Sequence, residues 1–168
     1  MKLVMSVIAI GLLATAHDAA AQKITDAQIA AIVVTANQVD IDAGNLAAER
    51  AASEQVKAFG RSMVSAHTGV NKSAAALVQK LNVVPQENDT SRALKADGDK
   101  SLAALRQQTG AAFDKAYIDR EVAYHQQVLD ALDKTLIPGA TNAELKSLLV
   151  SVRPAFVAHL NHAKQLQR

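Results

Sequence analysis

Four predicted helices each carry one polar side chain on an otherwise apolar face. Reading the chain in steps of three and four residues collects the side chains that share one face of a helix. The polar residues on these faces are Asp40, His67, His125 and His159. Imidazole and carboxylate groups that converge in a helical core can bind zinc, iron, manganese or copper. The pattern therefore predicts a site for a single transition-metal ion.

The remaining positions of the four faces are those of a packed core. In chain order the faces are Ile29, Val33, Ala36, Asp40, Ala43 and Ala47; then Val56, Phe59, Met63, His67, Val70, Ala74, Leu77 and Leu81; then Ile118, Val122, His125, Leu129, Leu132 and Leu136; and last Leu145, Leu149, Val152, Phe156, His159, Ala163 and Leu166. A lone histidine on such a face is more often a buried, hydrogen-bonded residue than a ligand. Recurrence on all four helices is what favours a shared site.

The first two candidate ligands should lie at one height. A helix rises only ~1.5 Å per residue, so ligands must lie at matching distances from the turn that joins their helices. Asp40 precedes Ser53 by 13 residues, and His67 follows it by 14. We expect the hairpin around Ser53 to place the two side chains next to each other.

The second pair of candidate ligands fits less well. His125 precedes Pro138 by 13 residues, whereas His159 follows it by 21. This difference predicts that His159 lies roughly two turns from the level of His125, less the residues that form the loop. Pro154 should also kink the last helix. His162, one turn further along, is a poorer candidate by the same measure.

Glu121 is a fifth candidate, because it lies four residues before His125 on the same helical face. It could be a further ligand or an acceptor that orients the imidazole. A di-iron carboxylate centre normally has two Glu-x-x-His pairs, but Tyr124 stands where Glu121 would need its histidine. We therefore expect a mononuclear site in a non-catalytic protein rather than a ferroxidase.

The same residues permit a second interpretation without any metal. Asp40 and His67 could form a buried hydrogen-bonded pair that the other two imidazoles extend into a network. The protein would then be a structural or interaction module whose partner is another protein. An enzyme ranks behind both readings, because the sequence has neither a nucleophile elbow nor a phosphate-binding glycine loop. Arg120 and Arg153 are expected to form ion pairs or face solvent.

The chain is expected to be all-α, a ferritin-like antiparallel four-helix bundle with an additional short helix between the second and third long helices. Aromatic residues make up only 3% of it and the prolines number three, a composition that favours helices. Thr25, Ser53 and Asn142 are predicted helix caps. The predicted helices span residues 26–52, 54–82, 91–107, 111 to a stop at 137–139, and 143–166. Asp97-Gly98-Asp99 should weaken the third of these, which is the short one.

The first 21 residues have the pattern of a secretory signal peptide. A basic start is followed by an apolar run over residues 3–16 and by a small-residue end. We expect cleavage after Ala21, leaving one domain over residues 22–168 that is periplasmic or secreted. The apolar run is too short for a lasting transmembrane helix, and no later stretch approaches ~20 apolar residues.

Composition argues against several classes of function. The chain has no cysteine, which excludes disulfides, thiolate zinc sites, iron–sulfur clusters and a lipid-anchored amino-terminal cysteine. The net charge of +2 is scattered along the chain, so a nucleic-acid partner is not expected. The outward helix faces mix Lys, Gln, Asp and Ser, which favours a monomer or a weak dimer.

Several runs of the sequence resemble one protein family. The runs are VKAFGRSMVSAHTGVNKSAAAL, FDKAYIDREVAYHQQVL and RPAFVAHL, with Pro85 between the first two. They are similar to the exported bacterial family called domain of unknown function 4142, and the likeness covers roughly residues 24–166. This resemblance implies a ferritin-like helical bundle, export, and a shared pattern of one histidine in each run. Ala66 and Asp40 depart from the acidic residue and the glutamate usual in that family, which argues against a carboxylate-rich site.

Overall fold

The protein is helical throughout the part that the computed structural model describes, residues 23–168. The elements are α1 (Asp26–Arg50), α2 (Glu54–Lys80), α3 (Asp89–Arg106), α4 (Gly110–Ala131), the π-helix η1 (Leu132–Leu136), α5 (Ile137–Gly139) and α6 (Ala143–Leu166). The predicted all-α class is therefore confirmed. The predicted signal peptide, residues 1–21, lies outside the described residues.

Three predicted helix starts are confirmed by their caps. The Thr25 side chain accepts a hydrogen bond from the backbone N–H of Gln28, whose side chain accepts from the backbone N–H of Thr25. The side chains of Ser53 and Asn142 accept from the first turns of α2 and α6. Asn88 caps α3, which therefore begins slightly earlier than expected. Such local signals fix where the long helices begin.

One interruption expected from the sequence does not break a helix. The weakness expected at residues 97–99 is wrong, because α3 is continuous there. Gly98 instead lets α3 approach α1, since a Cβ atom at this position would lie 2.6 Å from Cγ2 of Val39. The stop expected at residues 137–139 is confirmed, because the helix of α4 continues through η1 and α5 and ends at Gly139.

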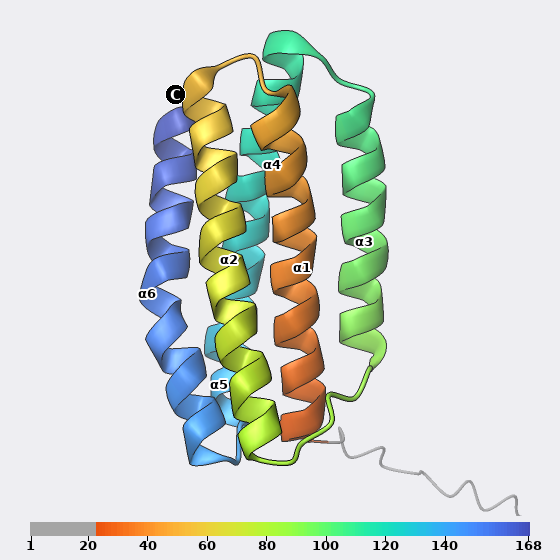
Figure 1. The fold of residues 1–168 in the computed structure, drawn as a ribbon, viewed down its shortest axis with the longest axis vertical. Coiled ribbons are helices and arrows are strands. Elements are labelled where there is room, and N and C mark those ends of the chain that lie inside the picture. The colour runs from red at the N-terminus through yellow and green to blue at the C-terminus, as the bar shows by residue number, and fades with distance from the viewer. Residues whose placement is uncertain (1–22) are drawn as a thin grey trace, which may run out of the picture.

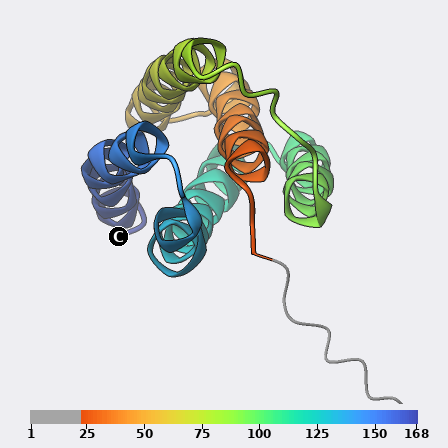
Figure 2. The same cartoon turned by 90° about the horizontal axis from the view of Figure 1, so that it is seen from below.

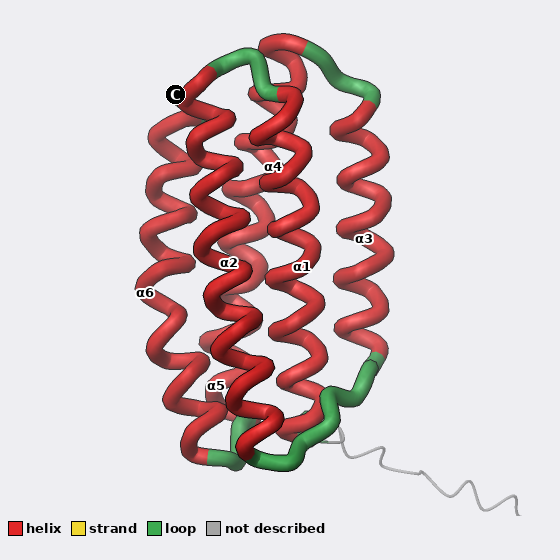
Figure 3. Tube along the Cα trace, viewed as in Figure 1, coloured by secondary structure: helices red, strands yellow, loops and turns green. Residues whose placement is uncertain are grey.

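The four long helices lie side by side, and α3 lies outside them (Figure 1). The end-on view shows α1, α2, α4 and α6 around a common interior, with α3 on the flank of α1 (Figure 2). The loops gather at the two ends of the molecule (Figure 3). Within residues 23–168, none of the helices combines the length and the apolar character needed to cross a membrane.

The interior contains two apolar clusters that are separated by polar residues. One cluster includes Phe59, Phe113 and Tyr117, and the other includes Leu149 and Phe156. Along α1, α2 and α4, fully buried acidic residues and histidines stand between the members of these two clusters. The fold thus places its ionisable groups in the middle of the core, where desolvation makes unpaired charges costly.

Two carboxylates accept hydrogen bonds from the backbone of the loops that join helices. Asp114 accepts hydrogen bonds from the backbone N–H groups of Ala52 and Ser53, each 2.8 Å long. Asp26 accepts from the backbone N–H groups of residues 141–142 in the same way. Asp114 belongs to the FDKAY run quoted above, so this part of the run fixes the α1–α2 turn against the start of α4.

Candidate metal centre

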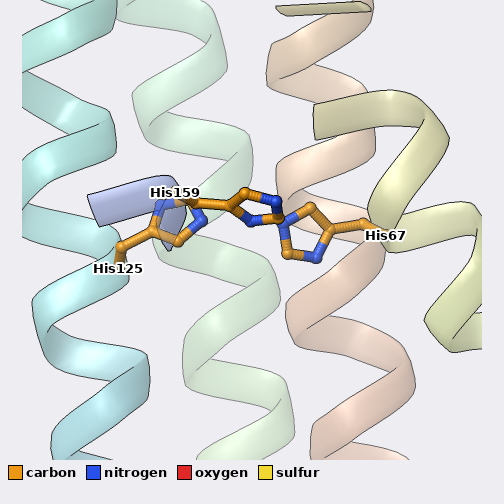
Figure 4. A group of neighbouring side chains, drawn as sticks. All are labelled: His67, His125 and His159. Carbon is orange, nitrogen blue, oxygen red and sulfur yellow. The ribbon is translucent and has the colours of Figure 1, made fainter. Parts of the chain in front are cut away.

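Three imidazoles from three helices meet in the middle of the core. His67 of α2, His125 of α4 and His159 of α6 point toward one another (Figure 4). Their ring centroids are 5.7 Å apart for His67 and His125, 5.3 Å for His67 and His159, and 5.4 Å for His125 and His159. One nitrogen from each ring lies within 4.8 Å of the others. The rings therefore form a nearly equilateral triangle.

This triangle has the size that a tetrahedral metal site requires. With metal–nitrogen bonds of ~2.0–2.1 Å, each ring centroid lies ~3.2 Å from the ion, and tetrahedral angles then separate the centroids by ~5.2 Å. The observed separations, 5.3–5.7 Å, exceed that value only slightly. The nitrogens themselves, which lie within 4.8 Å of one another, would have to approach to ~3.4 Å to bind one ion.

The expectation that His159 lies two turns from His125 is wrong, since the two rings are level. The prediction counted residues from Pro138 in both directions, but the two helices do not end and begin at that residue. The helix of α4 extends to Gly139 and α6 begins at Ala143, so His125 lies 14 residues before one end and His159 lies 16 after the other. The remaining difference is less than one helical turn.

Asp40 adds a carboxylate to the triangle, as the first hairpin predicted. Its Oδ2 atom lies 2.8 Å from Nε2 of His67 and 3.9 Å from Nε2 of His125. Oδ2 and the His67 nitrogen nevertheless lack a hydrogen-bond partner, which at 2.8 Å means that the N–H direction of the ring misses the oxygen. Tetrahedral ligands at ~2.0–2.1 Å lie ~3.4 Å apart, a value between the two observed distances.

Asn37 fixes which nitrogen of His67 faces the centre. The Asn37 Nδ2 group donates to the backbone carbonyl of Val33 at 2.9 Å, so its Oδ1 atom is the side that faces His67. Because that oxygen can only accept, Nδ1 of His67 carries the hydrogen in their 2.7 Å contact. In the neutral ring Nε2 then carries the lone pair. This is the arrangement that orients histidine ligands in metal sites.

Glu121 fixes which nitrogen of His125 faces the centre. Nδ1 of His125 donates to the backbone carbonyl of Glu121 at 3.0 Å and lies 3.4 Å from the Oε2 atom of its carboxylate. Nε2 of His125 is thereby left free to face the centre, where it has no hydrogen-bond partner. The contact with Nδ1 suits an acceptor that orients the imidazole, and a carboxylate oxygen of Glu121 also lies within 4.8 Å of ligand atoms of Asp40 and His125, as a further metal ligand would.

Arg120 holds both carboxylates from the far side. Its guanidinium donates to Oδ1 of Asp40 at 2.8 Å and to Oε1 of Glu121. The expectation of an ion pair at Arg120 is confirmed, but the pair is buried rather than solvated. The guanidinium also lies over the ring of Tyr124, 4.6 Å from its centroid. Each carboxylate thus uses one oxygen for Arg120 and keeps the other for the histidines.

The charges of the cluster act on the two carboxylates in opposite directions. Burial by itself would raise the pKa of Asp40, but the contact with His67 and the charges of Arg120 and His125 outweigh it and hold that pKa well below its usual range. Burial raises the pKa of Glu121, and the nearby negative charge of Asp40 raises it further. Asp40 is therefore ionised at neutral pH, as a metal ligand must be.

The imidazoles also differ from one another. Burial lowers the pKa of His159 to about 4, and the charges of His67 and His125 act in the same direction. Burial would lower the pKa of His125 too, but the contact with Glu121 and the charge of Asp40 raise it instead. At neutral pH His159 thus carries an available lone pair for a metal ion.

Other polar candidates lie away from the triangle. His162 is exposed and packs its ring against Phe59, with 5.1 Å between the centroids. Arg153 forms an exposed ion pair with Asp133 at 2.7 Å, as expected. Pro154 lies within α6, which continues past it as one helix.

The sequence reasoning missed Asn37 and the position of Arg120. Asn37 lies three residues before Asp40 and is fully buried, so a search for polar residues one turn from each candidate ligand would have found it. Arg120 is adjacent to Glu121 in sequence, but its reach to Asp40 of α1 depends on how α4 packs. No local pattern in the sequence encodes that contact.

Comparison with known proteins identifies the family. The family model described as Domain of unknown function (DUF4142) matches residues 12–166, which is nearly the whole chain. The chain belongs to this family. Neither the curated proteins nor the solved structures contain a significant match. The resemblance found in the sequence is confirmed, and the family description assigns no activity to the triangle of histidines.

Proposed function

We propose that this DUF4142 protein is an exported, ferritin-like four-helix bundle that binds one transition-metal ion in its core. His67, His125, His159 and Asp40 would be the ligands, and Glu121 would support them. The role would be metal handling or tolerance of envelope stress, without catalysis. Zinc, iron, manganese and copper all accept this set of imidazole and carboxylate ligands.

One observation carries this proposal. Nε2 of His67, Nε2 of His125, Nδ1 of His159 and Oδ2 of Asp40 are all buried without a hydrogen-bond partner among residues 23–168. Buried polar atoms in a core are normally satisfied, yet one nitrogen of each imidazole lies within 4.8 Å of the others, and Oδ2 of Asp40 lies 2.8 Å and 3.9 Å from the Nε2 atoms of His67 and His125. A cation bound among these groups would give them the partner that they lack.

The ligand count supports storage or transfer of an ion rather than catalysis. Three imidazoles and one carboxylate fill the four positions of a tetrahedral site, whereas catalytic zinc sites keep one position for water or substrate. Asp40, His67 and His125 are each at most 1% exposed. Substrate has no free position to occupy in such a closed site.

A metal-free network is the second candidate, and the contact between Asp40 and His67 favours it. An unprotonated Nε2 atom of His67 and an ionised Oδ2 atom of Asp40 would repel each other at their distance of 2.8 Å. Without a metal ion, either the imidazole nitrogen or the carboxylate must therefore hold a proton. Arg120 and one protonated imidazole would balance the charges of Asp40 and Glu121. The two candidates therefore differ in whether a metal ion or a proton lies in the centre.

The test starts from the full chain expressed in a bacterium that can export it. Mass spectrometry of the protein from the periplasmic fraction should give an amino terminus at Gln22. Elemental analysis should find one metal ion per chain, and a chelator should lower the melting temperature. A His67→Ala/His125→Ala double variant should lack both the metal and the response, whereas His162→Ala should keep them.

The results separate the candidates clearly. Protein without metal, with no thermal response to added zinc, copper, manganese or iron, would contradict metal binding and favour the proton-bridged network. Loss of metal in His162→Ala as well as in the double variant would show that the metal binds elsewhere. An unprocessed amino terminus in the cytoplasmic fraction would contradict export.

A further inference from the structure

An apolar hollow lies beneath α3, beside the histidines, and Asn37 and Phe156 line it as well as contacting His67. Its volume is about 460 Å³, and α1, α3, α4, η1 and α6 all contribute to its lining. The walls include Val33, Leu94, Val128, Leu132, Leu149 and Phe156. Pockets of this size and character commonly hold small organic ligands. We refer to this space as the α3 hollow.

The packing of α3 explains why the hollow exists. Only Ser91 and Leu105, close to the two ends of α3, are buried. In the middle of α3, Gly98 approaches Val39 of α1. Because so few side chains of α3 are buried, outward movement of this helix loses few apolar contacts. The same packing therefore gives a ligand both a space and a way to enter.

The π-helix forms part of the same wall. Leu132, Thr135 and Leu136 of η1 all line the hollow. In this segment the N–H of Ile137 donates to the carbonyl of Leu132, five residues back. Single-turn π segments weaken a helix and occur frequently at functional sites. The position of η1 is thus an observation, independent of the hollow, that points to ligand binding there.

The charges around the hollow select the kind of ligand. Asp89 and Asp97 line it, and the lining formed by the described residues contains no Lys, Arg or His. Asp89 is already paired with Arg92, whereas Asp97 makes no ion pair with any residue in 23–168. A smaller adjoining hollow of about 190 Å³ does include Arg120. That guanidinium is already engaged by Asp40 and Glu121.

We infer that the α3 hollow binds a cationic amphiphile, with the aliphatic tail between α1, α4 and α6 and the cationic head near Asp97. The apolar walls remove the tail from water. The unpaired carboxylate attracts the head, and an anionic head would meet two carboxylates and no free cation. This site is distinct from the metal site, although Phe156 lines the hollow and also packs against His67, 5.1 Å between centroids.

Calorimetric titration with three ligands of equal chain length tests the inference. Decyltrimethylammonium should bind with one-to-one stoichiometry and about tenfold more tightly than decanoate, since a difference of that size corresponds to one nearby charge pair. Decanol should lie between them. All titrations stay below the concentration at which the ligand forms micelles.

Two pairs of variants make the test specific. Ala93→Trp fills the hollow from α3 and should weaken all three ligands, whereas Ala96→Trp, an exposed position on the same helix outside the lining, should weaken none. Asp97→Asn should abolish the preference for the cation and leave decanol unchanged, whereas Asp99→Asn should preserve it.

Several outcomes would overturn the inference. They are the absence of one-to-one binding to the wild-type chain, equal affinity for the cation and for decanoate, and equal effects of the two tryptophan variants. Metal content is measured on the same samples. Because none of these substitutions touches a histidine of the triangle, failure of ligand binding with metal retained would leave the proposed function standing.

Discussion

The polar cluster and the α3 hollow lie on either side of the same stretch of α1, yet they are built in opposite ways. In the cluster, charged groups from four helices lie within a few ångströms of one another. The hollow has apolar walls and a few polar groups. Asn37 and Phe156 belong to both regions. The contrast teaches that the interior of the four long helices is closely packed, while the flank beneath α3 is left open.

Removing Arg120 should have the largest effect, because it would leave two buried carboxylates without their shared cation. Arg120→Met is expected to reduce the free energy of unfolding by about 3–5 kcal/mol at neutral pH, as for other buried pairs that lose one partner. Chemical denaturation of the wild-type chain and of the variant measures this difference in the free energy of unfolding. The matched control is Arg153→Met, whose ion pair with Asp133 is exposed. Equal destabilisation by the two substitutions would mean that the cluster does not depend on Arg120.

The glycines on the two sides of α1 should respond differently to a methyl group. At Gly60 a Cβ atom would lie 2.7 Å from the Gly44 carbonyl oxygen, a backbone atom that cannot easily move. Gly60→Ala should therefore cost about 1–3 kcal/mol. Gly98→Ala should cost less, because it meets the Val39 side chain, which lines the smaller hollow and can turn into it.

Gly69→Ala is the control for these two substitutions. No atom lies within 4 Å of a Cβ at that position, so the change should stabilise the protein by about 0.5–1 kcal/mol through helix propensity alone. Thermal and chemical unfolding of the three variants provide the comparison. A greater loss at Gly98 than at Gly60 would show that α3, and not α2, is the tightly packed neighbour of α1.

Asn37 should matter for metal affinity more than for stability. Asn37→Leu keeps the volume of the side chain but removes the acceptor that sets the orientation and tautomer of His67. The affinity should fall roughly 10- to 100-fold, as when other outer partners of ligands are removed. Competition with a chelator of known affinity measures it. Asn71→Leu is the control, since Asn71 reaches only the Val34 carbonyl of α1; a similar loss there would refute the role of Asn37.

Much of the fold follows from local signals in the sequence. Thr25, Ser53 and Asn142 are caps whose side chains act within their own first turn, so a sequence pattern is enough to find them. The partnership of Asp40 and His67 could also be predicted, because a short hairpin leaves little freedom in height. Both cases depend on neighbours in the sequence.

The rest depends on contacts between distant segments. The level of His159 was misjudged because both distances were counted from Pro138, whereas the helix of α4 ends at Gly139 and α6 begins only at Ala143. The α3 hollow depends on how far a peripheral helix stands from its neighbours. Gly98 looked like a helix breaker, and only its contact with Val39 shows why a glycine is there.

X-ray absorption spectroscopy of the zinc-loaded protein tests the central claim most directly, because it counts and identifies the ligands of the ion. The proposed centre predicts three imidazole nitrogens and one carboxylate oxygen at ~2.0–2.1 Å. His159→Ala should retain two imidazoles, while His162→Ala should retain three. A shell of oxygen atoms without imidazole scattering, or a spectrum that His159→Ala leaves unchanged, would contradict the claim that the histidine triangle holds the metal.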